Sequence, residues 1–293
     1  MRRAVLGALL ALIACTDPPP PTPQARYVVG EPYQLGGLWF YPREDLSLTE
    51  TGLASVAADT RPGRRTANGD IHDPGALVAA HRTLQLPAVL RVTNLENGRE
   101  VLVRVNDRGP GNPGRVVELS RRAAVLLGVS PDRPAQVRVA VDGNLSGAAT
   151  AGLPSSDARG PRVEAIATAP VERESLEPPP GARAAGSRPA GTASAAVADP
   201  VAPATPVELP DRAVQGTPSP GRLFVAGSTF AGRDAASRQA VRIGARARAE
   251  PVGSGRRAEW RVRAGPFDTV SEADRTLEQA LRAGVSEARI LVE

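Results

Sequence analysis

The chain has 293 residues, enough for two modest domains, but aromatic residues make up only 3% of it and Gly and Pro number 29 each, so much of the length lies outside any packed core. The net charge of +5 comes from Arg alone, because the chain has no Lys, and it indicates polyanionic partners such as nucleic acid or an anionic cell-surface polymer. The single cysteine excludes a disulfide framework.

The N-terminus has the build of a secretory signal peptide. Arg2 and Arg3 precede an apolar run, residues 4–14, that is too short to span a bilayer as a mature helix. The run ends in "LIAC", which is typical of the lipobox of bacterial lipoproteins, so we expect lipidation at Cys15. An ordinary cleavage site with a chance cysteine is the alternative. Thr16, in place of Asp, favours the outer membrane as the site of the anchored, periplasm-facing chain.

Composition divides the rest of the chain. The central segment is rich in Ala, Pro, Gly and Ser and has almost no large apolar residues, so it cannot bury enough surface to offset its ordering entropy. The predicted organisation is a signal peptide over residues 1–14, a lipidated, Pro-rich tether over 15–26, a folded domain over 27–141, a disordered linker over 142–219 and a second folded domain over 220–293.

The stretch "AVLRVTNLENGREVLVRVND" in the first domain predicts a β-hairpin. Two β-branched runs flank Asn97-Gly98, the pair that best tolerates the positive φ angles of a two-residue turn. Three valines alternate with other residues on the second strand, so one face of this strand is expected to be buried: Val101, Val103 and Val105.

A short helix follows in the same domain. Ser120 is expected to cap it, and Gly128 ends it after Leu127. Several short strands with one capped helix indicate a small β-barrel.

The second domain alternates strand and helix patterns in the order βαββαβ, which is the split ferredoxin-like arrangement. Ser271 with Asp274 resembles a capping box, and Gly284 ends the second helix. The predicted elements are strand 223–225, helix 233–243, strands 246–252 and 259–264, helix 271–283 and strand 288–292.

Long ordered motifs resemble a known family. "GRRTANGD", "LVAAHRTLQLP", "RVTNLENGREVLVRVNDRGP" and "ELSRRAAVLLG" are similar to the double-psi β-barrel domain of the rare lipoprotein A (RlpA) family. "WRVRAGPFDTVSEADRTLEQALRAG" resembles a SPOR domain, the module that follows the barrel in this family. The resemblance implies a mainly β fold plus an α+β module: a six-stranded double-psi β-barrel joined by a long disordered linker to a ferredoxin-like SPOR domain.

The resemblance also implies an activity. The family contains endolytic lytic transglycosylases that cut peptidoglycan glycan strands, especially strands without stem peptides, and leave 1,6-anhydro products. One acid/base carboxyl protonates the glycosidic oxygen and then removes the proton of the sugar's own C6 hydroxyl. No cofactor and no metal are implied.

Three residues fall on the family's functional positions. Asp107, before Arg108-Gly-Pro, is the implied acid/base, and Arg108 beside it is a candidate glycan-binding residue; a turn-forming Asp is the alternative. His81 either tunes the carboxylate or is a satisfied structural histidine. Asp70 stands where the family usually has Glu, and a turn role is an equal alternative.

One loop departs from the family pattern. Sugars stack on aromatic rings, and the family commonly has Trp-Tyr-Gly and Phe-His in the segment read here as "ASVAADTRPGRR". The residues that replace these five are Val56, Ala57, Ala58, Arg61 and Pro62. The absence of the aromatic rings favours the alternative function, a non-catalytic peptidoglycan-binding lipoprotein of the division septum.

The second domain carries its own candidates. SPOR modules lay their sheet against glycan without stem peptides, and the candidates for that surface are Trp260, Arg261, Arg263 and Phe267. The alternative is that the two aromatic residues belong to the core. The expected partners are therefore peptidoglycan, the membrane through the lipid anchor, and division-site proteins at the septum. RNA binding, which a basic βαββαβ domain also fits, is disfavoured by the export signal and by the lack of an aromatic-rich RNP motif, so no nucleic-acid partner is expected.

Overall fold

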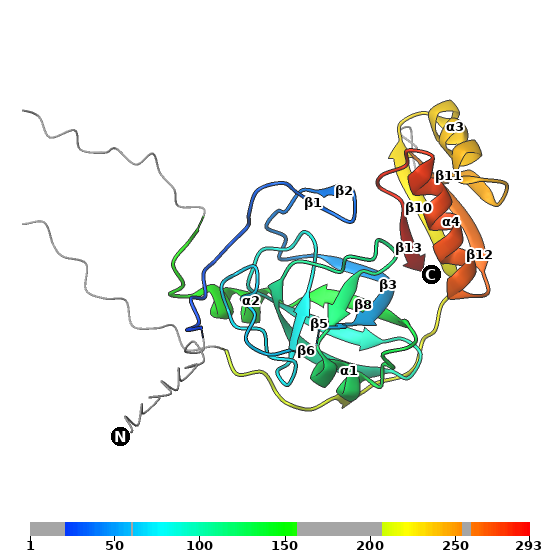
Figure 1. Ribbon diagram of the computed structural model, residues 1–293. Helices are drawn as coiled ribbons and strands as arrows, with labels where there is room; N and C mark the ends of the chain where they lie inside the picture. Colours follow the sequence, from blue (N-terminus) through cyan, green and yellow to red (C-terminus); the bar gives the residue numbers. More distant parts are fainter. Residues whose placement is uncertain (1–20, 60, 157–206, 254–258) are drawn as a thin grey trace, which may run out of the picture.

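The computed structural model describes residues 21–59, 61–156, 207–253 and 259–293. These form a β-barrel and a C-terminal α+β domain that pack against each other (Figure 1). The predicted signal peptide, Cys15 and residues 157–206 of the predicted linker lie outside the described residues. Within those ranges, no helix is both long and apolar enough to cross a membrane.

Six strands close into the barrel in the order β4-β7-β3-β8-β5-β6, and β6 pairs again with β4. The pairs β3–β7 and β4–β6 are parallel and the others are antiparallel, so the barrel is mixed, and its six strands confirm the predicted six-stranded barrel. The strands are β3 (Thr49–Val56), β4 (Val78–Ala80), β5 (Ala88–Asn94), β6 (Arg99–Asp107), β7 (Val117–Leu119) and β8 (Ala135–Val141).

The predicted hairpin is the antiparallel pair of β5 and β6, and its core face is as expected, since all three alternating valines are at most 1% exposed. The turn differs from the prediction. Residues 95–98 form a four-residue loop in which only Gly98 has a positive φ, of 78°. Asn97 instead caps the loop through its side chain, whose oxygen accepts from Arg99 N and whose amide donates to Leu127 O.

Helix α1 (Arg121–Leu127) confirms the predicted cap. The Ser120 side chain accepts from Ala123 N, and Gly128 ends the helix with a left-handed φ of 70°. The Ser120 hydroxyl also donates to Ala76 O at 2.7 Å, so the cap fastens α1 to the loop between β3 and β4.

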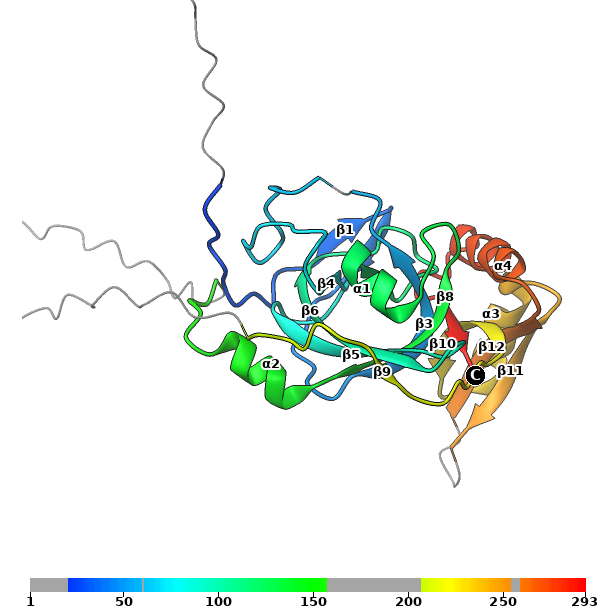
Figure 2. The ribbon, with the colours of Figure 1, turned by 90° about the horizontal axis from the view of Figure 1, so that it is seen from below.

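Both described ends of the predicted disordered linker are ordered, which corrects the prediction there. Helix α2 (Gly143–Thr150) begins at an Asp142 cap that low-complexity composition obscured. Residues 207–222 form a strap along the barrel, which Figure 2 shows running past β5 to the C-terminal domain. The strap is held by β9 (Val214–Gln215), which pairs with β6, and by the exposed ion pair of Asp211 with Arg122.

The C-terminal domain has the predicted βαββαβ order. Its antiparallel sheet has the strand order β11-β12-β10-β13, with both helices on one face (Figure 1). The elements are β10 (Leu223–Phe230), α3 (Arg233–Ile243), β11 (Ala247–Val252), β12 (Glu259–Phe267), α4 (Val270–Arg282) and β13 (Arg289–Val292). The cap of α4 is Thr269 and not Ser271, because the Thr269 hydroxyl accepts from Glu272 N; Gly284 has a φ of 81° just past the helix, as expected.

A short hairpin completes the barrel domain. It consists of β1 (Tyr33–Leu35) and β2 (Leu38–Phe40) and lies beside the barrel on the side of the C-terminal domain (Figure 1). The Phe40 ring stacks under the Arg82 guanidinium, 5.2 Å from the ring centroid, so the hairpin is tied to the turn that follows β4.

Candidate active site

Two of the three predicted residues lie at neighbouring strand ends. Asp107 is the last residue of β6, and His81 directly follows β4. The parallel register places Ala80 opposite Asp107, and the His81 backbone N–H donates to Asp107 O at 3.1 Å. The site is therefore built where two parallel strands of the barrel end together.

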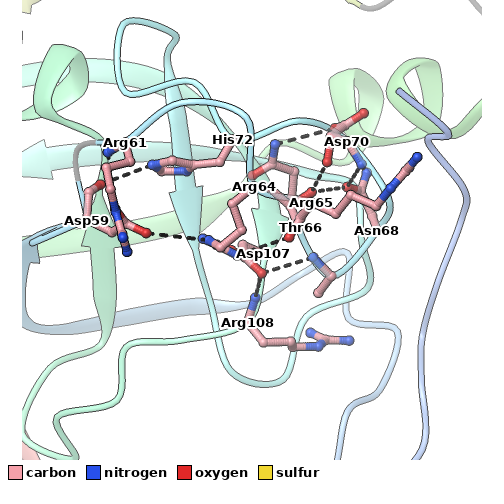
Figure 3. A network of polar contacts seen from close by, with 12 residues as sticks. Asp59, Arg61, Arg64, Arg65, Thr66, Asn68, Asp70, His72, Asp107 and Arg108 are labelled. Atoms are coloured by element: carbon pink, nitrogen blue, oxygen red, sulfur yellow. Dashed lines mark hydrogen bonds and ion pairs between the residues drawn. The ribbon is translucent and has the colours of Figure 1, made fainter. Parts of the chain in front are cut away.

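The Asp107 carboxylate accepts three hydrogen bonds, as Figure 3 shows. Arg64 donates through Nη2 to Oδ2 at 2.7 Å, while the backbone N–H groups of Ala67 and Arg108 donate to Oδ1 at 3.0 and 2.9 Å. All three partners are donors, and together they fix the orientation of the carboxylate at the end of β6. The Asp107 side chain is 17% exposed, so solvent still reaches it.

Arg64 links Asp107 to the rest of the loop between β3 and β4, residues 57–77. Its Nε lies 3.8 Å from Asp59 Oδ2, and the Asp59 carbonyl contacts His72 Nε2 at 3.1 Å (Figure 3). This loop, which lacks aromatic rings, thus reaches Asp107 through the charged side chain of Arg64.

The His81 side chain is buried, and its ring nitrogens bind groups other than Asp107. Its Nδ1 accepts from the backbone N–H groups of Thr83 and Leu84, at 3.3 and 3.2 Å. With Nδ1 an acceptor, the neutral ring carries its proton on Nε2, which then donates to Glu50 Oε1 at 3.1 Å. His81 therefore fixes the turn after β4 and pairs with Glu50, a residue that the sequence did not single out.

Asp70 is also buried, and its carboxylate forms a salt bridge with Arg104. Its Oδ2 lies 2.7 Å from Arg104 Nη1 and accepts from the Asn68 and Asn106 side-chain amides at 3.2 and 3.4 Å. Figure 3 shows this cluster at the opposite end of the network from Asp59. The contacts agree with the turn role that the sequence left open, since they fold residues 66–70 against β6.

The Arg108 side chain binds backbone carbonyl groups and does not point to free solvent as a ligand-binding group would. Its guanidinium donates to the carbonyl oxygens of Leu84 and Val29, which join the N-terminal lead-in to the turn after β4. It also lies 5.9 Å from the Tyr33 ring centroid. Burial raises the pKa of Tyr33 and the negative charge of Asp107 adds to the rise, while Arg108 and Arg82 oppose it.

Glu118 on β7 is a second carboxyl at the site, which sequence reasoning missed. It lies within the motif "ELSRRAAVLLG", where it alternates with the buried Val117 and Leu119 and so points away from the core. Burial raises the pKa of Glu118, the charge of Asp107 raises it further, and Arg64 and His72 lower it. Two carboxyl groups in electrostatic contact are a common sign of acid–base chemistry.

A cavity of about 350 Å³ opens on the His81 side of the site. Its walls come from the β1–β2 hairpin, the barrel and the loop before β13, and they include Trp39, Phe40, Tyr41, Glu50, His81 and Arg82. Trp39 and Tyr41 are 59% and 65% exposed, which is unusual for large aromatic residues. The hairpin thus presents aromatic surface next to the barrel, although the loop between β3 and β4 has none.

The predicted residues of the C-terminal domain divide between its two faces. Phe267 is buried in the core under the helices, and Trp260 packs against the same core. Arg261 and Arg263 alternate with the buried Val262 and point to the opposite, helix-free face. Arg263 stacks over Phe224, 4.3 Å from the ring centroid, and pairs with Glu250 at 2.8 Å.

Comparisons with known proteins agree with this geometry. Residues 49–140, which make up the barrel, match the family model described as lytic transglycolase. Endolytic peptidoglycan transglycosylase RlpA of Yersinia pestis is 46% identical over 123 residues, 41% of this chain and 34% of that protein. RlpA of Pseudomonas aeruginosa (strain UCBPP-PA14) is 31% identical over 276 residues, 92% of this chain and 79% of that protein.

The mixed barrel, the carboxyl groups at its strand ends and the family match together define a peptidoglycan lytic transglycosylase, an enzyme of the lyase type. The match to the Pseudomonas protein extends beyond the barrel, because it covers 92% of the chain. The chain belongs to the RlpA family.

Proposed function

We propose that the chain cleaves peptidoglycan glycan strands from within, prefers strands without stem peptides and leaves 1,6-anhydro ends. The observation that carries this proposal is Asp107, a solvent-reached carboxylate at the end of β6 that accepts three hydrogen bonds. A fixed carboxylate that solvent reaches can come within hydrogen-bond distance of a sugar hydroxyl and act as its general base.

Asp107 is the base in this scheme. The C6 hydroxyl oxygen of the sugar attacks C1 of the same ring and passes its proton to Asp107, while the C1–O4 bond breaks and the leaving O4 takes up a proton from a carboxylic acid. Because the nucleophile belongs to the substrate, no water enters and the ring closes to the 1,6-anhydro form. This chemistry differs from that of hydrolases, in which a second carboxylate activates water or attacks the sugar.

Naked glycan strands test the proposal. We expect the mature chain to release 1,6-anhydro products, detected by mass spectrometry, and Asp107→Asn to release at least about 100-fold less. The Asn side chain suits the same turn, so circular dichroism should show an intact barrel. Equal product yield from Asp107→Asn would reduce Asp107 to a turn residue.

The substrate preference follows from the C-terminal domain in this proposal. Its helix-free sheet face carries Arg261 and Arg263, whose guanidinium groups can donate hydrogen bonds to the hydroxyl groups of a bare glycan strand. We propose that this domain is a SPOR domain that brings the enzyme to denuded strands at the division septum, where it meets division-site proteins.

We also propose that Cys15 carries a lipid that anchors the chain, facing the periplasm, in the outer membrane. The support is the lipobox sequence and the Thr at position 16. We expect Cys15→Ser to move the chain from the membrane fraction to the soluble fraction or to block its processing. Unchanged fractionation of a folded Cys15→Ser variant would contradict the anchor.

A second candidate function is supported by the altered loop between β3 and β4. Without its aromatic rings, the barrel is a candidate for a binding protein that marks stripped glycan and does not cut it. The same assay separates the two functions: binding of naked strands by the wild type, with no anhydro product over long incubation, would establish the second.

A further inference from the structure

Glu118 and Asp107 lie in one row across three strands. Ala80 on β4 is opposite Glu118 of β7 in the antiparallel register and opposite Asp107 of β6 in the parallel register. Residues that are paired directly point to the same face of a sheet. Two strand spacings of about 4.8 Å place the Cα atoms of the two acids about 10 Å apart, with only a methyl group between them.

The burial pattern confirms which face this is. The preceding row, formed by Ala79, Val105 and Leu119, belongs to the barrel core, and all three side chains are at most 4% exposed. Glu118 lies between the buried Val117 and Leu119 and so points outward, and a register irregularity between Val105 and Asp107 lets the Asp107 side chain leave the core face of Val105 and reach Arg64 in the loop between β3 and β4. Both carboxyl groups face the same patch of surface.

Two small residues keep the space beside Glu118 open. A Cβ atom at Gly109 would lie 3.3 Å from Glu118 Oε2 and 3.2 Å from Ala80 Cβ. Any side chain at position 109 would therefore press against the Glu118 carboxyl. Gly109, which has no side chain, and Ala80, which has only a methyl group, leave space beside that carboxyl. The φ of Gly109, 154°, is also one that other residues rarely adopt.

The two carboxyl groups have opposite surroundings. Asp107 accepts from Arg64, Ala67 and its neighbour Arg108. Glu118 is half-buried, and within the described residues no donor lies at hydrogen-bond distance from its carboxyl group. Its charged form has the negative Asp107 facing it from β6, while Arg64 and His72, both from the loop between β3 and β4, offset part of that repulsion.

We propose that Glu118 is the catalytic acid that protonates the glycosidic oxygen, so that the reaction uses two carboxyl groups with separate roles. This assignment rests on the proposed transglycosylase function and deepens it. The C1–O4 bond breaks as the Glu118 proton moves to O4. A bond forms between O6 and C1, and the O6 proton moves to Asp107. Proton exchange with solvent then returns both groups to their starting states.

Environment separates the two roles. Glu118 meets no hydrogen-bond donor among the described residues and faces the charge of Asp107, a setting that suits a carboxyl group giving a proton, whereas the three donors around Asp107 hold its carboxylate in place for the C6 hydroxyl. A single residue would have to change from acid to base within one turnover against the three donors around it. Glu118 supplies the proton without that requirement.

The test compares wild type, Glu118→Gln, Glu118→Asp and Glu100→Gln on naked glycan strands over a range of pH. Glu100 is the matched control because it lies at the other end of β6, paired with Arg91. We expect Glu118→Gln to lower the rate by about 10²- to 10⁴-fold and to lose the wild type's fall in rate at high pH. Glu118→Asp should keep that fall, and Glu100→Gln should match the wild type.

A second measurement does not depend on activity. Carbon NMR of the chain labelled at its glutamate carboxyl carbons identifies the Glu118 signal as the one that disappears in Glu118→Gln. We expect the pKa of this signal to lie above that of an ordinary Glu, and we expect Asp107→Asn to lower it. An ordinary titration that ignores Asp107→Asn would overturn the acid role. An active wild type whose rate equals that of Glu118→Gln would also overturn the acid role. Neither of these two results would contradict the transglycosylase activity itself. A wild type that makes no anhydro product would instead overturn the proposed function, and this role with it.

Discussion

Arg115 of the barrel and Asp274 of α4 form a two-pronged ion pair that joins the two domains. The Nη1–Oδ1 and Nη2–Oδ2 distances are 2.8 and 3.0 Å, and the Arg115 side chain is only 8% exposed. The same interface includes a bond from the Thr51 hydroxyl to Val292 O at 2.6 Å, and Leu53 of β3 packs into the C-terminal core. The domains are therefore fastened together by buried polar and apolar contacts, as well as by the strap.

The first prediction concerns this ion pair. Asp274→Ala leaves the Arg115 guanidinium buried without its carboxylate, so we expect the free energy of unfolding to fall by about 1–3 kcal/mol. Urea denaturation followed by circular dichroism measures the change. Glu278→Ala on the same helix is the control, since its pair with Arg282 is exposed and should contribute less than about 0.5 kcal/mol. Equal stability of both variants would mean that the domains do not depend on the pair.

The second prediction concerns pH and Glu118. Because the folded-state pKa of Glu118 is raised above 4.5, the Glu118 carboxyl binds more protons in the folded chain than in the unfolded chain between its two pKa values. The contribution of Glu118 to the free energy of unfolding therefore falls as pH rises through that window. We expect Glu118→Gln to flatten this dependence and to be more stable than the wild type at pH 8, measured by urea denaturation at pH 5 and pH 8. The same slope in both proteins would contradict the prediction.

The third prediction concerns His81. Removing its ring in His81→Ala leaves two backbone N–H groups, those of Thr83 and Leu84, without their acceptor, so we expect a loss of about 1–3 kcal/mol of stability. We expect a smaller loss of anhydro-product yield than Asp107→Asn gives, because the ring positions the turn beside Asp107. Glu50→Gln, which still offers an oxygen to Nε2, should keep most of the activity. An inactive but fully stable His81→Ala would instead make His81 part of the chemistry.

The sequence predicted those features that depend on residues close together in the chain. The alternation of Val101, Val103 and Val105 predicted the buried face of β6, and Ser120 and Gly128 predicted both ends of α1. Asp274 shows the limit. Its spacing from Ser271 suggested a helix cap, but its partner is Arg115, which is distant in the sequence and is reached only when the domains pack.

The acids of the site show the same limit. Asp107 could be found from its motif, but its neighbour Glu118 could not, because their relationship passes through Ala80 on a third strand. The long-range pairing of β4 with both β6 and β7 creates that row, and no periodicity within one segment reveals it. The ordered strap escaped prediction for a related reason: residues 207–219 bond to the barrel through their backbone, which composition does not report.

The fourth prediction concerns the exposed aromatic rings of the β1–β2 hairpin and the residue after it. Trp39→Ala and Tyr41→Ala should weaken binding of naked glycan by about fivefold or more each, because sugar rings stack on aromatic faces and these two border the cavity beside His81. Stability should change by less than about 0.5 kcal/mol, since both rings are mostly exposed. Val125→Ala, an exposed apolar residue on α1, is the control in sedimentation with purified strands. Unchanged binding by a variant that combines Trp39→Ala and Tyr41→Ala would show that the hairpin is not a glycan surface.

The last prediction concerns the helix-free face of the C-terminal sheet. Arg261 and Arg263 are 39% and 26% exposed there, and the carboxylates of Glu250 and Glu293 already balance their charge. They are therefore suited to hydrogen-bond neutral sugar hydroxyls and the scattered lactyl carboxylates of a stripped strand. We expect the Arg261→Ala, Arg263→Ala double variant of the full chain to bind amidase-treated sacculi at least about tenfold more weakly. Arg238→Ala, a cation on α3 that faces away from this surface, should bind as the wild type does. Equal retention of all three proteins on amidase-treated sacculi would remove this face from recognition and leave the barrel as the only glycan contact of the described domains.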